Sequence, residues 1–187
     1  MRKIVSGLFI SLDGVIDEPH EWHFPYFNDE MGEAVGSSMM AADCMLLGRI
    51  TWQGFAGYWP DKTEDEVQMA DYMNNTPKFV VSTTLDSVDE WQNSTLVKGD
   101  FVEEITNLKE QEGGNIGVTG SAHLVRSLLH HNLLDELHLL VHPIVIGSGK
   151  KLFPDGTEQT PLKLLNSKTF STGVMHLVYG KDEGQKE

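Results

Sequence analysis

Short apolar runs alternate with amphipathic segments along most of the chain. Runs of this length, bounded by turn residues, favour buried strands over helices. Strands are therefore expected at residues 3–12, 44–48, 78–84, 94–99 and 115–120. Helical segments are expected between them, at residues 29–42, 49–59, 65–75, 100–114 and 121–133.

The last third of the chain has a different pattern. A longer strand is expected at residues 135–149, and residues 161–170 and 174–180 have the pattern of a closing hairpin. Strand–helix alternation with an antiparallel finish predicts an α/β fold, with helices on both faces of a mixed sheet. The chain length suits one domain, which we place at residues 1–180, followed by a flexible tail at 181–187.

Local signals mark the ends of two of these helices. Asp100 is an expected N-cap, and Gly113 and Gly114 are expected to stop the helix that follows it. In the segment 121–133, Leu124, Leu128 and Leu129 share one face, as in a helix packed on a sheet.

Charge and composition exclude several classes of partner. The net charge is -14, whereas binding to nucleic acid phosphates needs clustered Lys and Arg, so neither nucleic acid nor an anionic membrane surface is expected as a partner. No apolar run approaches the roughly 20 residues that span a bilayer. The N-terminal apolar stretch runs into Asp13 and Gly14 without a cleavage signal, so a cytoplasmic location is expected. Cys44, the single cysteine, lies in an apolar strand pattern and is interpreted as a core residue.

Glycine and hydroxyl residues follow three of the expected strands. Ligands gather at the carboxyl ends of strands in α/β sheets, where the free N–H groups of helix N-termini attract phosphate. The residues concerned are Gly48, Arg49 and Thr51, then Ser82 and Thr83, then Gly117, Gly120 and Ser121. Each segment alone also fits an ordinary capped turn, but three in one small sheet favour a dinucleotide site. The spacing is not that of a Rossmann fingerprint.

Aromatic residues dominate the loop after the first strand. Trp22, Phe24 and Phe27 are candidates for the wall of a pocket that holds a flat ring, and packing of the loop is the alternative interpretation. Asp13, at the end of the first strand, is the candidate acid: a carboxylate in an apolar pocket has a raised pKa and can donate a proton.

Two other kinds of site are disfavoured. His138 and His142 point to the same face of a strand, but they are too far apart to chelate a metal by themselves, and no HExxH motif or cysteine pair supports a metal site. The GSG at residues 147–149 does not have the GxSxG spacing of a hydrolase elbow.

The order of these motifs resembles the dihydrofolate reductase superfamily. The segments are SLDGVI with a following WHFP, then LLGRITW, KFVVSTT, IGVTGS and DELHLLVHPIVIGSGKKLF. The last of them is most similar to the branch that contains the C-terminal reductase domain of riboflavin-biosynthesis enzymes. The resemblance covers about the whole chain, and it implies a three-layer α/β/α fold around a mixed, mostly parallel sheet of about eight strands.

The resemblance also implies a cofactor and the residues that hold it. NADPH is expected in an extended pose, with its phosphates against Gly48, Arg49 and Thr51 on one side and the helix start at Gly117, Gly120, Ser121 and Ala122 on the other. Ser82 and Thr83 match the strand end at the 2′-phosphoribose. Phe9, Ile10 and Gly14 match the border of the nicotinamide. Members of this branch form homodimers, so a homodimer is expected here.

Two departures from the family pattern bear on the substrate. Tyr26 and Phe27 stand where true dihydrofolate reductases have the acid that orients the pterin, and Thr83 and Thr84 stand where relatives often carry an arginine. The expected activity is therefore NADPH-dependent reduction of a pterin-like or aminopyrimidine compound, such as a 5-amino-6-ribosylaminouracil phosphate, with Asp13 contacting the substrate or relaying a proton. The alternative is a non-catalytic NADP(H)-binding protein or sensor with the same fold.

Overall fold

The computed structural model describes residues 1–182, which build one eight-stranded sheet. The strands lie in the order β4-β3-β2-β5-β1-β6-β8-β7. Strand β8 runs in the direction opposite to the other seven, so its pairings with β6 and β7 are antiparallel. Their bounds are β1 (Ile4–Ser11), β2 (Ala42–Gly48), β3 (Lys78–Val81), β4 (Ser94–Val97), β5 (Asn115–Thr119), β6 (Glu136–His142), β7 (Leu162–Thr169) and β8 (Met175–Lys181). The predicted mixed, mostly parallel sheet with an antiparallel finish is confirmed.

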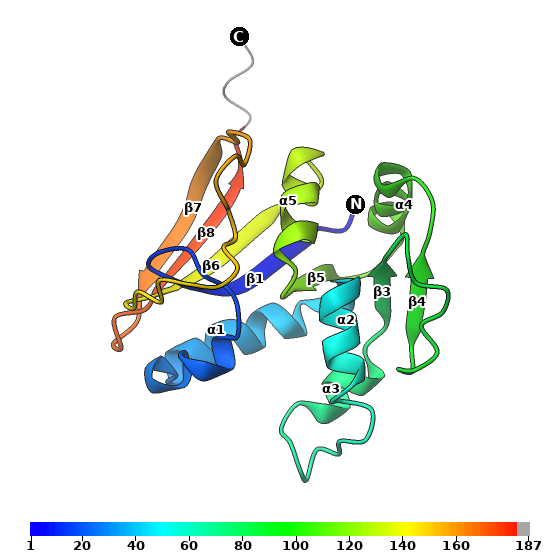
Figure 1. The fold of residues 1–187 in the computed structure, drawn as a ribbon, viewed down its shortest axis with the longest axis horizontal. Coiled ribbons are helices and arrows are strands. Elements are labelled where there is room, and N and C mark those ends of the chain that lie inside the picture. Colours follow the sequence, from blue (N-terminus) through cyan, green and yellow to red (C-terminus); the bar gives the residue numbers. More distant parts are fainter. Residues whose placement is uncertain (183–187) are drawn as a thin grey trace.

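Helices cover both faces of the sheet and complete a three-layer α/β/α fold (Figure 1). One face carries α4 (Phe101–Glu110) and α5 (Ala122–His130), and α1 (Asp29–Met40) crosses the other. Helices α2 (Arg49–Ala56) and α3 (Ala70–Asn75) flank β2 and β3. Two 3₁₀ turns, η1 (Pro19–Glu21) and η2 (Phe24–Tyr26), lie in the loop between β1 and α1.

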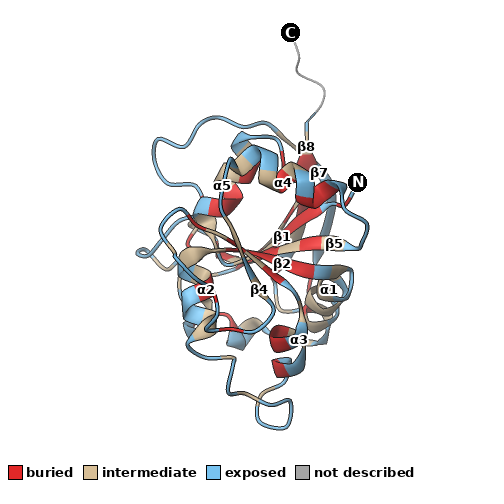
Figure 2. Ribbon diagram, turned by 90° about the vertical axis from the view of Figure 1, so that its right-hand side faces the viewer, coloured by how far each residue is buried: buried red, intermediate tan, exposed pale blue. Residues whose placement is uncertain are grey.

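Buried residues concentrate on the central strands of the sheet (Figure 2), whose successive side chains point to opposite faces. Ile4, Leu8 and Ile10 of β1 point into the cluster beneath α4 and α5, whereas Phe9 points to the α1 face. Cys44 is buried in the first of these clusters, as expected for a core residue. A second cluster around Trp52 and Trp91 fixes α2 and α3 to β2 and β3.

Polar side chains start three helices at the positions their types favour. Asn28 accepts a hydrogen bond from the N–H of Met31, Asp100 from Glu103 and Ser121 from Leu124. The predicted N-cap at Asp100 is confirmed. The following helix ends at Glu110, before the two glycines expected to stop it.

Two elements are shorter than their patterns predict. The helix expected at 65–75 begins only at Ala70, because Met69 adopts a left-handed backbone conformation at φ 77°. The strand expected at 135–149 ends at His142, since Pro143 has no N–H for a ladder hydrogen bond, and the chain turns back with Ile144 N donating to His142 O at 2.8 Å.

The C-terminal strand continues to Lys181, where Leu162 of β7 pairs with it. The predicted tail at 181–187 thus begins inside β8, and residues 183–187 lie outside the described residues. None of the helices within residues 1–182 combines the length and apolar character needed to cross a bilayer.

Candidate functional site

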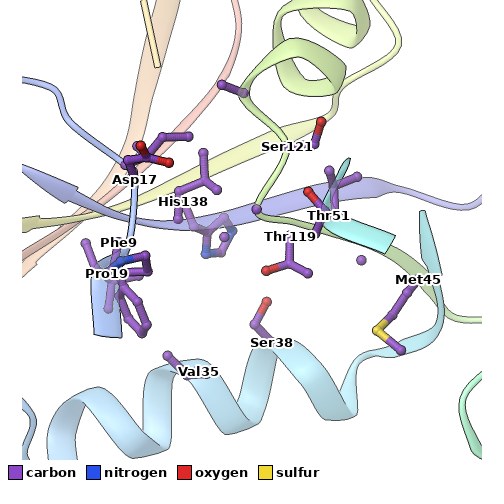
Figure 3. Close-up of a pocket in the computed structure, with 18 of the residues that line it drawn as sticks. Phe9, Asp17, Pro19, Val35, Ser38, Met45, Thr51, Thr119, Ser121 and His138 are labelled. Carbon is purple, nitrogen blue, oxygen red and sulfur yellow. The ribbon is translucent and has the colours of Figure 1, made fainter. Parts of the chain in front are cut away.

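A cavity of about 1140 Å³ lies between α1 and the sheet (Figure 3). It runs from the α1 face of β1, β5 and β6 past the carboxyl end of β5 to the N-terminus of α5. Its far side is the segment that follows β6, which contributes Gly149, Lys150 and Lys151. The cavity thus connects the α1 face of the sheet with the N-terminus of α5.

The N-termini of α2 and α5 meet at one end of this cavity. A Cβ on Gly120, which has φ 75°, would lie 2.8 Å from Cγ2 of Thr51, and a Cβ on Gly48 would lie 2.5 Å from Oγ of Ser121. Only glycine lets the two helix starts approach so closely. Their free N–H groups and positive dipole ends therefore face the same region, which suits a pyrophosphate.

Two glycines leave part of the sheet side of the cavity, its floor, without side chains. Gly7 of β1 and Gly117 of β5 line it, and a Cβ on Gly7 would meet no atom within 4 Å. The missing side chains leave a flat strip of backbone, against which a planar ring can lie.

The third predicted segment lies at the same edge of the sheet. Val81 pairs with Gly48, so Ser82 and Thr83 leave β3 beside the residues that start α2. The Ser82 hydroxyl accepts hydrogen bonds from Thr84 N at 3.1 Å and Leu85 N at 3.0 Å, which is the turn chemistry left open as an alternative. Among the described residues, the Arg49 guanidinium donates a hydrogen bond to Gln53 on its own helix, at 3.1 Å, and to no other side chain. Within residues 1–182, Arg49 and Thr83 can therefore turn toward a ligand at this edge, although neither lines the cavity.

The inner part of the cavity has polar groups on an apolar background. Ser38 of α1 and Thr119 of β5 extend their hydroxyls toward each other across it, and the His138 ring lies between Phe9 and Thr119 (Figure 3). Thr119, Gly7 and His138 are register partners on three adjacent strands, so they form one row across the floor. Val35, Met45 and Leu140 supply apolar wall.

A second histidine extends this row. Nδ1 of His138 lies 3.1 Å from Nε2 of His176 on β8, and Nε2 of His138 lies 3.0 Å from a carboxylate oxygen of Glu136. Both histidines line the cavity. Burial is the main cause that lowers the pKa of His176, and the positive charge of Lys168 adds to it.

Asp13 is placed away from the cavity lining. Its carboxylate accepts hydrogen bonds from Ile146 N at 3.0 Å, Gly147 N at 2.8 Å and the Ser11 hydroxyl at 2.7 Å. These hydrogen bonds, that from Ile146 first, lower the pKa of Asp13 to about 2. The structure therefore gives Asp13 the role of tying the segment after β6 to the end of β1, and it stays ionised at neutral pH.

The three aromatic residues assigned to a substrate wall also lie outside the lining. Trp22 packs edge-on against the buried His142 and donates its indole N–H to Asp17 O at 3.0 Å. Phe24 and Phe27 are 64% and 50% exposed and contact His23. Their arrangement matches the loop-packing interpretation.

Of the predicted cofactor residues, six line the cavity. They are Phe9, Thr51, Gly117, Gly120, Ser121 and Ala122. Gly48 lies directly beside Ser121. Ile10 points into the core on the other face of the sheet, and the Gly14 carbonyl accepts a hydrogen bond from Leu152 N. Sequence reasoning missed Ser38, Thr119 and His176. Glu136 and His138, which alternate with leucines at the start of β6, were the available signal for a polar row.

Comparisons with known proteins agree with this fold. Residues 2–176 match the family model of the RibD C-terminal domain. The uncharacterized Bacillus subtilis protein YyaP is 31% identical over 182 residues, covering 95% of this chain and 94% of its own. The uncharacterized YwjB of the same organism is 29% identical over 181 residues, covering 95% and 98%.

Solved structures show the same architecture. A putative riboflavin biosynthesis protein from Shewanella sp. PV-4 superposes with a TM-score of 0.77 at 23% identity, covering 98% of this chain and 100% of that one. A diaminohydroxyphosphoribosylaminopyrimidine deaminase/5-amino-6-(5-phosphoribosylamino)uracil reductase from Thermotoga maritima gives 0.65 at 16% identity, covering 97% of this chain and 57% of that one. The resemblance inferred from the motifs is confirmed, and the chain belongs to the RibD C-terminal domain family.

Proposed function

We propose that this protein is an NADPH-dependent reductase of a flat nitrogen heterocycle of the aminouracil or pterin kind. The observation that carries the proposal is the continuity of one cavity: it joins two helix N-termini suited to a pyrophosphate to a slot between α1 and the sheet that suits a planar ring. Membership of the RibD C-terminal domain family, and the fold shared with the deaminase/reductase of Thermotoga maritima, support the same activity.

The residues at the open end fit a dinucleotide. Thr51 and Ser121 present hydroxyls there, and the close approach at Gly48 and Gly120 leaves backbone N–H groups for phosphate oxygens. Arg49, the first residue of α2 beside the end of β3, is the cation suited to a 2′-phosphate, so we propose a preference for NADPH over NADH. When bound, the reduced nicotinamide supplies a hydride to a C=N or C=O carbon.

The inner slot fits the heterocycle. Ser38 and Thr119 can hydrogen-bond to opposite edges of a ring, while Val35 and Leu140 exclude water from its faces. The reductase activity in the name of the Thermotoga protein makes a ribosylaminopyrimidine the first substrate to test.

The experiment is a fluorescence titration with NADPH and NADH, followed by screening of aminouracils, aminopyrimidines and dihydropterins for NADPH oxidation. Tight NADPH binding with turnover of one of these classes is expected. Stoichiometric binding without any oxidation would favour a non-catalytic NADP(H) sensor, and failure to bind either dinucleotide would refute the proposal.

A further inference from the structure

The polar row on the cavity floor continues as a chain of hydrogen bonds. Glu136 and His138 alternate on β6 and therefore share the α1 face of the sheet. His176 reaches the same face from β8, where it pairs with Leu140 and lies diagonal to His138. Three titratable groups on two antiparallel strands thus meet here, and the two histidines among them line the cavity.

The order of donors and acceptors in this chain is constrained. The ionised Glu136 is only an acceptor, so Nε2 of His138 carries a proton and donates it across 3.0 Å. The second contact, 3.1 Å between Nδ1 of His138 and Nε2 of His176, needs one donor and one acceptor. In the part of the chain that the structure describes, Nδ1 of His176 is the one ring nitrogen of the pair that makes no hydrogen bond.

This arrangement has two states that differ by one proton. In the discharged state, His176 donates from Nε2 to Nδ1 of His138 and offers a lone pair at its own Nδ1. In the loaded state, His138 carries protons on both nitrogens and donates from Nδ1, so His176 carries its proton on Nδ1 and offers an N–H to the cavity. The negative charge of Glu136 stabilises the loaded state.

The surrounding charges set how firmly the proton is held. Lys168 on β7 faces His176, with Glu30 of α1 at 3.9 Å from the lysine, and Lys3 pairs with Glu136 at 2.8 Å. Burial, His138 and Lys168 all lower the pKa of His176. These effects disfavour a positive charge on His176, in agreement with the loaded state, in which His138 carries the charge and His176 is neutral.

We propose that His176, supplied by His138 and Glu136, donates the proton that accompanies hydride transfer; this rests on the proposed function. As the hydride C–H bond forms on the heterocycle, the N–H bond at Nδ1 of His176 breaks and its proton goes to the ring nitrogen or oxygen of the C=N or C=O group. Nε2 of His176 then takes the Nδ1 proton of His138. NADPH is oxidised, the heterocycle gains two electrons, and solvent restores the missing proton.

The test combines kinetics with a readout that needs no turnover. In His176→Asn, kcat is expected to fall by about a hundredfold or more, with NADPH affinity unchanged and the ionisation of the donor lost from the pH profile of kcat. Glu136→Gln should give a smaller loss, because the loaded state loses its counter-charge. His131→Asn, at the exposed end of α5 and outside the cavity, is the matched control.

Nitrogen-15 NMR of the imidazoles supplies the second readout. Addition of 5,6-diaminouracil is expected to shift the Nδ1 signal of His176, and His176→Asn should shift the Nδ1 signal of His138, which loses its imidazole partner. A wild-type protein that oxidises NADPH while His176→Asn keeps its kcat and pH profile would overturn the relay and leave the proposed function standing. If the wild-type protein reduces no heterocycle, the proposed function itself is refuted. If 5,6-diaminouracil leaves the Nδ1 signal of His176 unchanged, His176 does not contact the ligand and the relay is refuted as well.

Discussion

Thr51 and Gly120 approach so closely that a Cβ on the glycine would lie 2.8 Å from Cγ2 of the threonine. Gly120 also has φ 75°, a conformation that side chains disfavour. Gly120→Ala should therefore separate the starts of α2 and α5 and weaken NADPH binding by about tenfold or more, or about 1.4 kcal/mol. Gly54 is exposed on α2, and a Cβ there would meet no atom within 4 Å, so Gly54→Ala should leave the affinity for NADPH unchanged. Equal affinities of both variants, measured by fluorescence titration, would contradict a phosphate site here.

Arg49 carries the expected discrimination between the two dinucleotides. In the described part of the chain its guanidinium is held by Gln53 alone, so it can turn to a 2′-phosphate. Arg49→Gln should weaken NADPH binding by about tenfold and leave NADH binding nearly unchanged, since a charged hydrogen bond contributes about 1.5–3 kcal/mol. Lys62→Gln, beyond the end of α2, is the control for a general loss of positive charge. A parallel loss for both dinucleotides would argue against contact with the 2′-phosphate.

Asp13 is expected to act on stability in acid. Its pKa is lowered from 3.8 to about 2 by hydrogen bonds that the unfolded chain lacks, so its stabilising contribution is fully present above pH 3.8 and is lost as pH falls through about 2. Asp13→Asn should lower the unfolding temperature at pH 5, and the difference from wild type should shrink toward pH 2. The variant should still bind NADPH. A difference in unfolding temperature that does not vary between pH 5 and pH 2 would refute this role.

Lys78 is fully buried, and its ammonium donates to the carbonyls of Asn74, Thr76 and Gln92 at 2.8–3.1 Å. Lys78→Met leaves these acceptors unpaired, so the free energy of unfolding should fall by at least about 2 kcal/mol. Lys163→Met on exposed β7 is the control. Burial lowers the pKa of Lys78 from 10.5 to about 8, so wild-type stability should rise with pH between these values. Denaturant titrations at pH 7 and 9.5 should show this rise in wild type and not in the variant.

The edge of the sheet beyond β8 leads us to propose a homodimer. On β7 and β8, Leu164 and Met175 are 49% and 44% exposed, and they lie on the face opposite His176. An exposed edge strand with apolar side chains is a common dimer contact. Light scattering should give the mass of two chains for wild type and of one chain for Leu164→Lys. A monomeric wild type would reject the proposal.

Sequence predicts those parts of this fold that depend on neighbouring residues. Local signals include the strand patterns, the N-cap at Asp100 and Gly48 shortly before Thr51. Each element that these signals predict is present. The two backbone N–H groups that bind Asp13 lie 133 and 134 residues away, and His176 meets His138 through the register of an antiparallel pair. No short-range pattern encodes such contacts, which is why the tie at Asp13 and the histidine pair become visible only in the folded chain.

The central position of β1 has a consequence for folding during synthesis. Ile4 pairs with Ile116 and Val5 with Glu136, so the first strand made has both of its neighbours in the second half of the chain. Contacts of such sequence separation slow folding, because the loop entropy is lost before the pairing energy is gained. On the ribosome, the apolar strand β1 must wait unpaired until β5 and β6 have emerged. A nascent chain that stalls before residue 136 exposes the centre of its own sheet and is therefore a natural client for a chaperone.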